Sequence, residues 1–355
     1  MVDPLKLQVH ADRDSSAPAP SEPSTDAASP SFHAYLRDLH QRCAAIDEGK
    51  VADYIPELAL ANPDWFGLCA VTKDGQCFEV GDCRQLFTIQ SIAKAFVYGL
   101  ALEDCGREYV HRRVSVEPTG EAFNSIVLDE VTNRPYNPMV NAGAIATTDL
   151  VQGKDAVERL KRMLDMFERY TGRSHDINVP VFLSEKTKGH RNRAIAYLML
   201  NFGMVTPRID ETLDLYFQQC AILVNAHDLA MMAATLANGG VNPVTGVRAI
   251  QSQYVKDVIS VMLTCGMYDY SGEWAYHIGI PAKSGVGGGI TAVAPNKLGI
   301  GTFSPRLDVK GNSVRGIQAC RALSEDFSLH VFSVEQAKLD LEAYLRGDRT
   351  DRPSS

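Results

Sequence analysis

The 355-residue sequence lacks the features that mark several classes of protein. No apolar run approaches about 18 residues, so we expect no transmembrane helix and no membrane partner. The first residues carry no apolar core of a signal peptide, so none is expected. The net charge is −8 and no basic stripe interleaved with aromatic residues appears, which argues against a nucleic-acid partner. Small charged metabolites remain open as partners.

The sequence also lacks metal-binding patterns. No C-x-x-C pair occurs among its eight cysteines, and no Cys/His cluster has zinc-ligand spacing, so we expect no metal and no cofactor. Most cysteines have apolar neighbours, which predicts buried free thiols and a reducing, cytoplasmic location. None of the nine histidines fits a metal or triad pattern, and all nine are interpreted as structural or surface residues.

Composition divides the chain into a folded part between two tails. Residues 1–31 are rich in Ala, Ser, Pro and Asp, which predicts a disordered tail, and residues 346–355 are interpreted in the same way. Apolar residues at helical spacing predict a helix over 32–47. Two β-rich runs around Lys73-Asp74-Gly75 then predict a hairpin.

The remaining pattern predicts a fold of mixed class, α/β or more closely α+β. Residues 88–265 are mainly helical, with a helix over 184–203 capped by Ser184 and stopped by Gly203, and another over 226–240. Strands are predicted at 287–295, 297–305 and 327–333, and helices at 314–327 and 334–347. We expect one catalytic domain over 32–345. Its sheet lobe comprises 32–87 and 266–345, with early and late strands paired in one antiparallel sheet, and its helical lobe comprises 88–265.

The stretch FTIQSIAKAF contains a candidate nucleophile and base, Ser91 and Lys94. By chance a chain this long holds about one S-x-x-K, and alone Ser91 would be interpreted as a helix cap. Lys94, however, sits among apolar residues, and the two side chains lie one helical turn apart. Burial lowers the pKa of a lysine, so a neutral amine could take the serine proton.

A second element is Lys283-Ser284-Gly285, which is similar to the K-[ST]-G strand of penicillin-binding and β-lactamase enzymes. Alone it would be interpreted as a Gly-rich turn. Together with an S-x-x-K far upstream and a strand-rich C-terminal part, it forms a much more specific pair of motifs.

Further stretches, in order, make the resemblance closer. They are YIPELA (54–59), NPMVNAGAI (137–145), SEKTKGHRNRAIAYLM (184–199), YFQQCAI (216–222), MYDYSGEWAY (267–276) and PAKSGVGGGI (281–290). Across about residues 32–340 the chain closely resembles the serine-dependent glutaminases, which hydrolyse L-glutamine to L-glutamate and ammonia. The resemblance implies a β-lactamase-like fold, an antiparallel sheet flanked by terminal helices with an inserted helical lobe. It also implies a homodimer or homotetramer.

The resemblance assigns roles residue by residue. It implies that Ser91 is the nucleophile, Lys94 its base, and Tyr268 a phenol that relays the proton or helps ammonia depart. The backbone N–H groups of Ser91 and Val286 would form the oxyanion hole. The substrate would be held by Tyr54, Asn141, Glu185, Asn192 and Tyr216, together with Ser91, Tyr268 and Val286. Glu185 suits the substrate ammonium, while Asn and Tyr donors suit its carboxylate and amide.

Several alternatives stay open on the sequence alone. Asn124 falls in a family-like stretch but is interpreted as structural. Glu185 and Asn192 are seven residues apart on one predicted helix and would share a face. The general base could be Lys94 or Tyr268. A β-lactam or peptide substrate stays open as an alternative, although the S-D-N motif of β-lactamases does not occur. A binding protein without catalytic activity is a further alternative. The absence of a G-x-S-x-G motif argues against an α/β-hydrolase fold.

Overall fold

The computed structural model describes residues 30–120 and 122–350. The α-helices are α1 (Phe32–Ala44), α2 (Pro56–Ala59), α3 (Ala93–Cys105), α4 (Arg107–Arg113), α5 (Asn141–Asp149), α6 (Ala156–Thr171), α7 (Val179–Lys188), α8 (His190–Asn201), α9 (Ile209–Cys220), α10 (Ala226–Ala237), α11 (Ser252–Cys265), α12 (Ser271–His277), α13 (Val314–Phe327) and α14 (Leu341–Thr350). The strands are β1 (Gly67–Thr72), β2 (Cys77–Gly81), β3 (Phe87–Thr88), β4 (Leu223–Val224), β5 (Ala282–Ser284), β6 (Gly289–Ala294) and β7 (Leu298–Phe303). Two 3₁₀ turns, η1 (Gln90–Ile92) and η2 (Tyr268–Tyr270), complete the described elements.

The main sheet pairs strands from both ends of the chain. Its order is β2-β1-β7-β6-β5, all neighbours are antiparallel, and β1 lies directly beside β7. The expected pairing of early and late strands is therefore confirmed, as is the mixed α and β class with one antiparallel sheet. The predicted hairpin is β1–β2, closed by a turn in which the Gly75 N–H donates to the Thr72 carbonyl.

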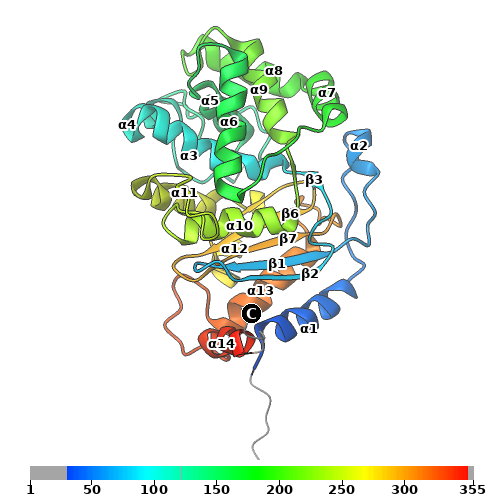
Figure 1. Ribbon diagram of the computed structural model, residues 1–355. Helices are drawn as coiled ribbons and strands as arrows, with labels where there is room; N and C mark the ends of the chain where they lie inside the picture. Colours follow the sequence, from blue (N-terminus) through cyan, green and yellow to red (C-terminus); the bar gives the residue numbers. More distant parts are fainter. Residues whose placement is uncertain (1–29, 121, 351–355) are drawn as a thin grey trace, which may run out of the picture.

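Helices cover both faces of this sheet (Figure 1), and the alternation of side chains in β1 shows how. Leu68 and Ala70 point into an apolar cluster with α1, α13 and α14, whereas Cys69 and Val71 point into the cluster formed with α3, α10 and α11. Position 301 in β7 has room only for glycine, because a Cβ there would stand 2.1 Å from the Ala226 carbonyl oxygen of α10. Helix α10 therefore packs directly on the sheet, although its residues fall within the predicted helical lobe.

Two expectations about elements near the C-terminus are corrected. The predicted strand over 327–333 is wrong, because Phe327 ends α13 and Ser328 adopts a left-handed conformation with φ 50°. Phe327 packs between helices instead, where it contacts the rings of Phe32 and Tyr35. Val331 and Phe332 are exposed. The helix predicted over 334–347 begins at Leu341 as α14 and runs to Thr350, into the expected C-terminal tail.

The helix predicted over 184–203 is in fact two helices. Asn178 caps α7 through its side chain, which accepts from the Val181 N–H, so Ser184 is an internal residue and no cap. Gly189 then separates α7 from α8. Residues 1–29 and 351–355, most of the two expected tails, lie outside the described residues, and the lobe boundaries stay a prediction.

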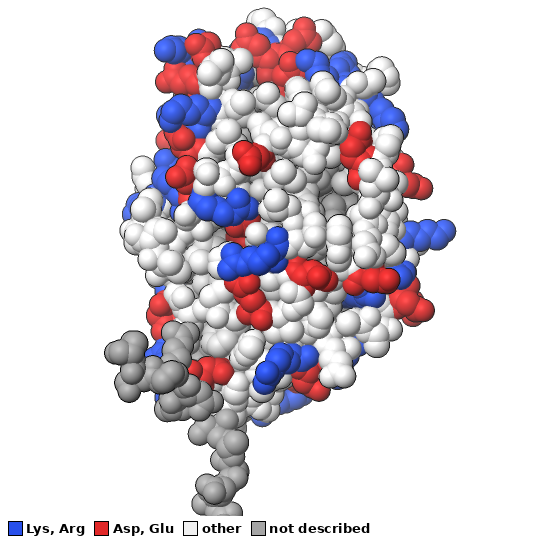
Figure 2. All heavy atoms as spheres, turned by 45° about the vertical axis from the view of Figure 1, so that its right-hand side comes forward, with Lys and Arg blue, Asp and Glu red and all other residues white. Residues whose placement is uncertain are grey.

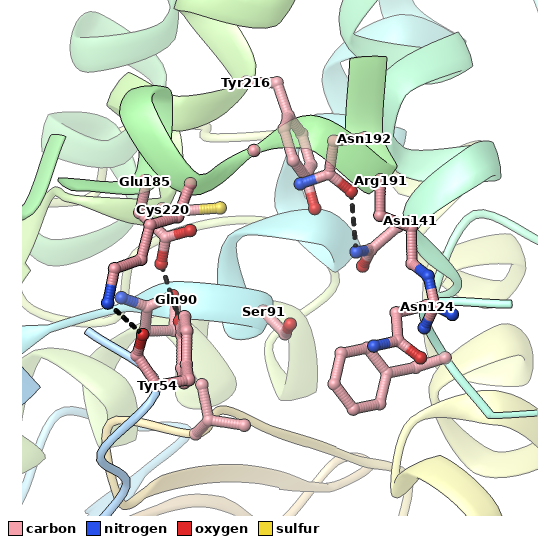
Figure 3. Close-up of a pocket in the computed structure, with 14 residues that line it drawn as sticks. Tyr54, Gln90, Ser91, Asn124, Asn141, Glu185, Arg191, Asn192, Tyr216 and Cys220 are labelled. Atoms are coloured by element: carbon pink, nitrogen blue, oxygen red, sulfur yellow. Dashed lines mark hydrogen bonds between the residues drawn. The ribbon is translucent and has the colours of Figure 1, made fainter. Parts of the chain in front are cut away.

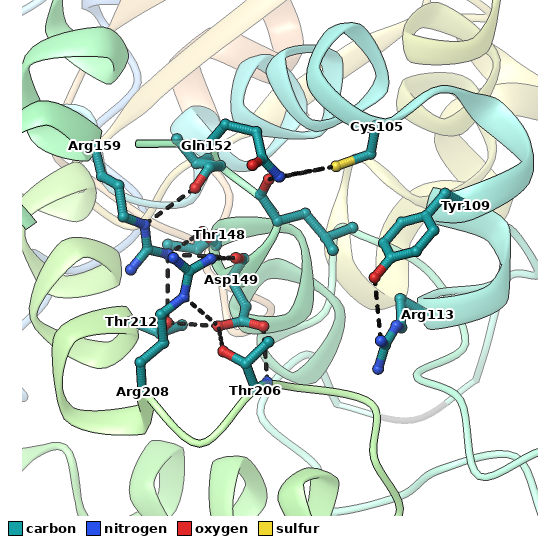
Figure 4. Close-up of polar contacts among 12 residues, drawn as sticks. Cys105, Tyr109, Arg113, Thr148, Asp149, Gln152, Arg159, Thr206, Arg208 and Thr212 are labelled. Atoms are coloured by element: carbon teal, nitrogen blue, oxygen red, sulfur yellow. Dashed lines mark hydrogen bonds and ion pairs between the residues drawn. The ribbon is translucent and has the colours of Figure 1, made fainter. Parts of the chain in front are cut away.

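A buried polar network ties α5, α6 and α9 together (Figure 4). The Asp149 carboxylate is 1% exposed and accepts from the Thr206 N–H and hydroxyl, both at 2.9 Å, and from the Thr212 hydroxyl at 2.8 Å. Arg208 pairs with Asp149, and the buried Arg159 guanidinium donates to the Thr148 carbonyl at 2.9 Å. The network satisfies the C-terminal end of α5, the helix whose first residue is Asn141.

The charged surface mixes both signs. Figure 2 shows Lys and Arg interspersed with Asp and Glu over the face that it presents, with no extended stripe of one sign. Within the part of the chain that the structure describes, no helix has the length and hydropathy needed to cross a bilayer.

Candidate active site

One cavity of about 340 Å³ gathers most of the residues singled out in the sequence. Seven of the nine line it: Tyr54, Ser91, Asn141, Glu185, Asn192, Tyr216 and Val286. They come from the loop before α2, from η1, from α5, α7, α8 and α9, and from the turn after β5 (Figure 3). The other two, Lys94 and Tyr268, are buried directly behind this lining.

Ser91 stands at the entrance to α3, the buried helix that follows η1. It makes no side-chain capping bond at either η1 or α3, so the capping interpretation of this serine finds no support. Its neighbour Gln90 has φ 50°, a left-handed conformation that costs a non-glycine residue about 1–3 kcal/mol. Strain of this kind concentrates at functional sites, where the surrounding structure holds a side chain in a fixed position.

Lys94 is fully buried one turn further along the same helix. Its Nζ donates to Asn141 Oδ1 at 2.6 Å and to the Met139 carbonyl at 3.2 Å. Burial lowers the Lys94 pKa to about 8, because the ammonium loses its hydration. The lysine is therefore close to half-neutral at mildly alkaline pH, with both of these partners fixing its amino group.

Asn141 and Asn192 extend this chain of hydrogen bonds along the cavity wall. Asn141 Nδ2 donates to Asn192 Oδ1 at 2.9 Å (Figure 3). The Oδ1 of Asn141 accepts from Lys94 Nζ. Asn141 is the first residue of α5 and not a loop-capping residue. Its amide orientation is fixed from both sides, because the oxygen must face the ammonium donor.

Glu185 provides the negative charge at another part of the wall. Its Oε1 accepts from the Tyr54 hydroxyl at 2.6 Å, and the same hydroxyl lies 3.3 Å from Gln90 Oε1 (Figure 3). Burial raises the Glu185 pKa, while hydrogen bonds from Tyr54 and Gln90 lower it in part. Glu185 and Asn192 both reach the cavity, but from α7 and α8, so the shared helix face predicted for them is wrong.

Tyr268 and Val286 close the site from the side of the sheet. Tyr268 is buried, has φ 55°, and its hydroxyl faces the Ser91 side chain and the Val286 N–H without forming a hydrogen bond of normal geometry. Burial is the main effect on the Tyr268 pKa and raises it. The Lys283 amino group lies 4.3 Å from the Tyr268 ring centroid and donates to the Ser284 carbonyl at 2.6 Å.

The sequence missed several residues of the cavity wall. They are Gln90, Phe123, Asn124, Lys188, Gly189, Arg191 and Cys220. Asn124, interpreted as structural, lines the cavity as well. Gln90 and Arg191 are sequence neighbours of Ser91 and Asn192, and that adjacency was the available signal. Lys188 and Arg191 add exposed cations beside a cavity whose wall also carries the Glu185 carboxylate.

Comparisons with known proteins show which family the chain is similar to. The family model described as "Glutaminase" matches residues 49–332. The glutaminase of Microcystis aeruginosa is 72% identical over 317 residues, which cover 89% of this chain and 94% of the relative. The chain belongs to the glutaminase family. The glutaminase of Trichormus variabilis is 64% identical over 297 residues, or 84% of this glutaminase and 89% of the relative.

Solved structures share the fold of this glutaminase. The protein Mglu in its glutamate form has a TM-score of 0.82 and 43% identity, and the match covers 86% of this chain and 71% of Mglu. The probable glutaminase of Bacillus subtilis has a TM-score of 0.78 and 34% identity, covering 84% of this chain and 97% of that one. The β-lactamase-like architecture implied by the resemblance is thereby confirmed.

Proposed function

We propose that this glutaminase hydrolyses the side-chain amide of L-glutamine through a covalent glutamyl ester on Ser91. The observation that carries the proposal is the placement of a cavity-lining serine one helical turn from a fully buried lysine with a lowered pKa. A serine hydroxyl attacks weakly by itself, so it needs an adjacent base. The family membership supports glutamine as substrate in preference to a β-lactam.

In the first step the Ser91 hydroxyl oxygen bonds to the amide carbon, and its proton passes to the neutral Lys94 amine. The resulting oxyanion accepts hydrogen bonds from the N–H groups of Ser91 and Val286. The carbon–nitrogen bond then breaks, the nitrogen takes a proton, and ammonia leaves. Water attacks the glutamyl ester, the ester bond breaks, and glutamate and the free serine are formed.

Lys94 is the better base of the two candidates. Burial moves its pKa down to about 8, toward the working range of an enzyme, whereas burial raises the pKa of Tyr268. A tyrosinate is therefore costly in this cavity. Tyr268 is better suited to give its proton to the departing nitrogen, because its neutral hydroxyl faces Ser91.

The substrate fits the polar pattern of the wall. The α-ammonium of glutamine pairs with the Glu185 carboxylate, held by Tyr54. The α-carboxylate accepts from the Asn192 amide and is attracted by Arg191 beside it. Tyr216, at the inner wall, orients the side-chain amide toward Ser91. That Mglu has been solved in a glutamate form supports a site of this chemistry, since glutamate is the product of the reaction.

The test measures ammonia release from L-glutamine by the purified chain and by Ser91→Ala, with Ser184→Ala as a matched control in α7, outside the cavity lining. We expect loss of turnover only in Ser91→Ala. Hydroxylamine added to the wild-type protein should capture the ester as glutamyl hydroxamate, which the Ser91→Ala protein should not form. Substantial ammonia release by Ser91→Ala would refute the nucleophile.

Substrate range and assembly belong to the same proposal. Asparagine is one methylene shorter, a difference typically worth about 1–3 kcal/mol, so we expect weaker but measurable competition from it. We further propose a homodimer or homotetramer working in the cytoplasm. The eight free cysteines, none of them in a disulfide, are consistent with a reducing compartment. Light scattering coupled to size exclusion tests the assembly.

A further inference from the structure

Four side chains with metal-ligating atoms meet on the sheet, and none of them belongs to the cavity lining. They are Cys69 of β1, Cys77 and Glu79 of β2, and His227 of α10, and their ligand atoms all lie within 4.8 Å of one another. None of the four lines the cavity that contains Ser91. The register explains the meeting, because Cys69 pairs with Glu79 and Val71 with Cys77, so all of these side chains point to the face that α10 covers.

We propose that Cys69, Cys77, Glu79 and His227 form a tetrahedral zinc site that fastens α10 to the β1–β2 hairpin. Two thiolates, one imidazole nitrogen and one carboxylate oxygen are a donor set that Zn²⁺ favours. The site was not expected from the sequence, since the ligands are spread over 158 positions with no C-x-x-C. Only the strand register and the packing of α10 bring them together.

Two of the distances match a shared tetrahedral ion. Around one zinc, two sulfurs stand about 3.8 Å apart and a sulfur and a nitrogen about 3.5 Å apart, from the usual metal–ligand bond lengths. The Cys69 and Cys77 sulfurs lie 3.9 Å apart, and Cys77 Sγ lies 3.3 Å from His227 Nδ1. His227 Nδ1 lies 2.9 Å from Glu79 Oε1, an ion-pair distance. A nitrogen and an oxygen on one zinc stand about 3.4 Å apart, so binding of the ion has to separate these two groups by about 0.5 Å.

The charges around the cluster are also suitable. Zinc bound to two thiolates and a carboxylate leaves one net negative charge, and Arg84, whose Nε donates to Glu79 Oε2 at 2.8 Å, can offset it. A coordinating thiol is deprotonated by the metal itself, so each thiol releases its proton on binding.

The first test uses the full chain, reduced with a phosphine and stripped of metal with a chelator. We expect one equivalent of Zn²⁺ to bind in competition with a chromogenic zinc indicator. Co²⁺ in its place should give tetrahedral visible bands and a thiolate charge-transfer band near the ultraviolet. Saturating zinc should raise the thermal midpoint by on the order of 5 °C, since it binds only the folded chain.

Variants locate the site. Cys77→Ser should weaken zinc binding by at least about 100-fold, and Glu79→Gln should weaken it while leaving both thiols in place. The matched control is Cys265→Ser, because Cys265 is a half-buried thiol of α11 outside the cluster. Ammonia release from glutamine should be unchanged in Cys77→Ser. Circular dichroism without metal checks that each variant is folded.

Three results would overturn the proposal. One is zinc affinity in Cys77→Ser or Glu79→Gln equal to that of the wild type, since the metal would then bind elsewhere. Another is a cobalt complex without the thiolate band. Failure of the reduced wild-type protein to take up zinc, with a Cys69–Cys77 disulfide forming in air instead, would assign the two cysteines to redox chemistry and also refute the site. None of these results depends on the role of Ser91.

Discussion

The role of Glu185 gives the sharpest test of how this glutaminase recognises its substrate. Glu185→Gln keeps the size of the side chain and an oxygen that can still accept from the Tyr54 hydroxyl. It removes the negative charge, and with it the counter-ion that we assign to the substrate ammonium. The change is therefore confined to one charge on an otherwise intact wall.

The magnitude follows from the setting of this carboxylate. Burial raises the Glu185 pKa, so the group is poorly hydrated and a cation bound to it is poorly screened. A hydrogen bond to a charged group is worth about 1.5–3 kcal/mol. At about 1.4 kcal/mol per tenfold change, KM should rise about 10- to 150-fold. The ammonium is remote from the scissile amide, so the lost energy is shared by ground and transition states and kcat should stay within about threefold.

The assay is steady-state ammonia release with two substrates. With L-glutamine the variant should show the rise in KM. Glutaramate lacks the α-amino group, so it should be a poor substrate with the same kcat/KM in wild type and variant. The matched control is Glu57→Gln, since Glu57 accepts from the Ser184 hydroxyl at 2.9 Å but does not line the cavity. Two results would show that Glu185 does not bind the ammonium. One is an unchanged KM for glutamine, and the other is a fall in kcat/KM for glutaramate as large as the fall for glutamine.

Three further predictions concern the base, the polar core and the packing of α5. Because the Lys94 pKa is lowered to about 8 and only the neutral amine is a base, kcat/KM should rise about tenfold per pH unit below 8 and level off above it. Asp149→Ala should lower the free energy of unfolding by about 3–5 kcal/mol in urea titrations, since it leaves buried donors and a cation without their acceptor. Gly143→Ala should lower kcat about 10- to 100-fold, because its Cβ would stand 1.9 Å from the Asn137 carbonyl oxygen and displace the start of α5.

Each of these predictions has a control or a result that would contradict it. A kcat/KM profile that is flat from pH 6 to 9 would contradict Lys94 as the base. For the polar core, Asp165→Ala removes an exposed partner of Lys161 and should cost less than about 1 kcal/mol, so equal effects at 149 and 165 would contradict the network. For α5, the matched change is Gly272→Ala, where an added Cβ meets nothing within 4 Å. Equal kcat in both glycine variants would contradict the packing argument.

Local chemistry made part of this protein readable from its sequence. The spacing of Ser91 and Lys94, the two β-rich runs and the turn at Gly75 each depend on residues a few positions apart, and the structure has them as expected. The order of the family-like stretches also sufficed to identify the family, which the comparisons confirm. Local signals failed where packing decides: residues 327–333 have a β-like composition, yet Phe327 ends α13 and packs on Tyr35, while Val331 and Phe332 are exposed.

Everything that depends on distant contacts was decided by the tertiary structure. Burial, and not sequence position, lowers the Lys94 pKa, and only folding brings the Asn141 amide against that amine. The division at Gly189 sends Glu185 and Asn192 to the cavity from two helices. Likewise Cys77 and His227 are 150 positions apart, and they meet because α10 lies across the strand register. Sequence supplied the reactive groups, but their ionisation and geometry are properties of the folded chain.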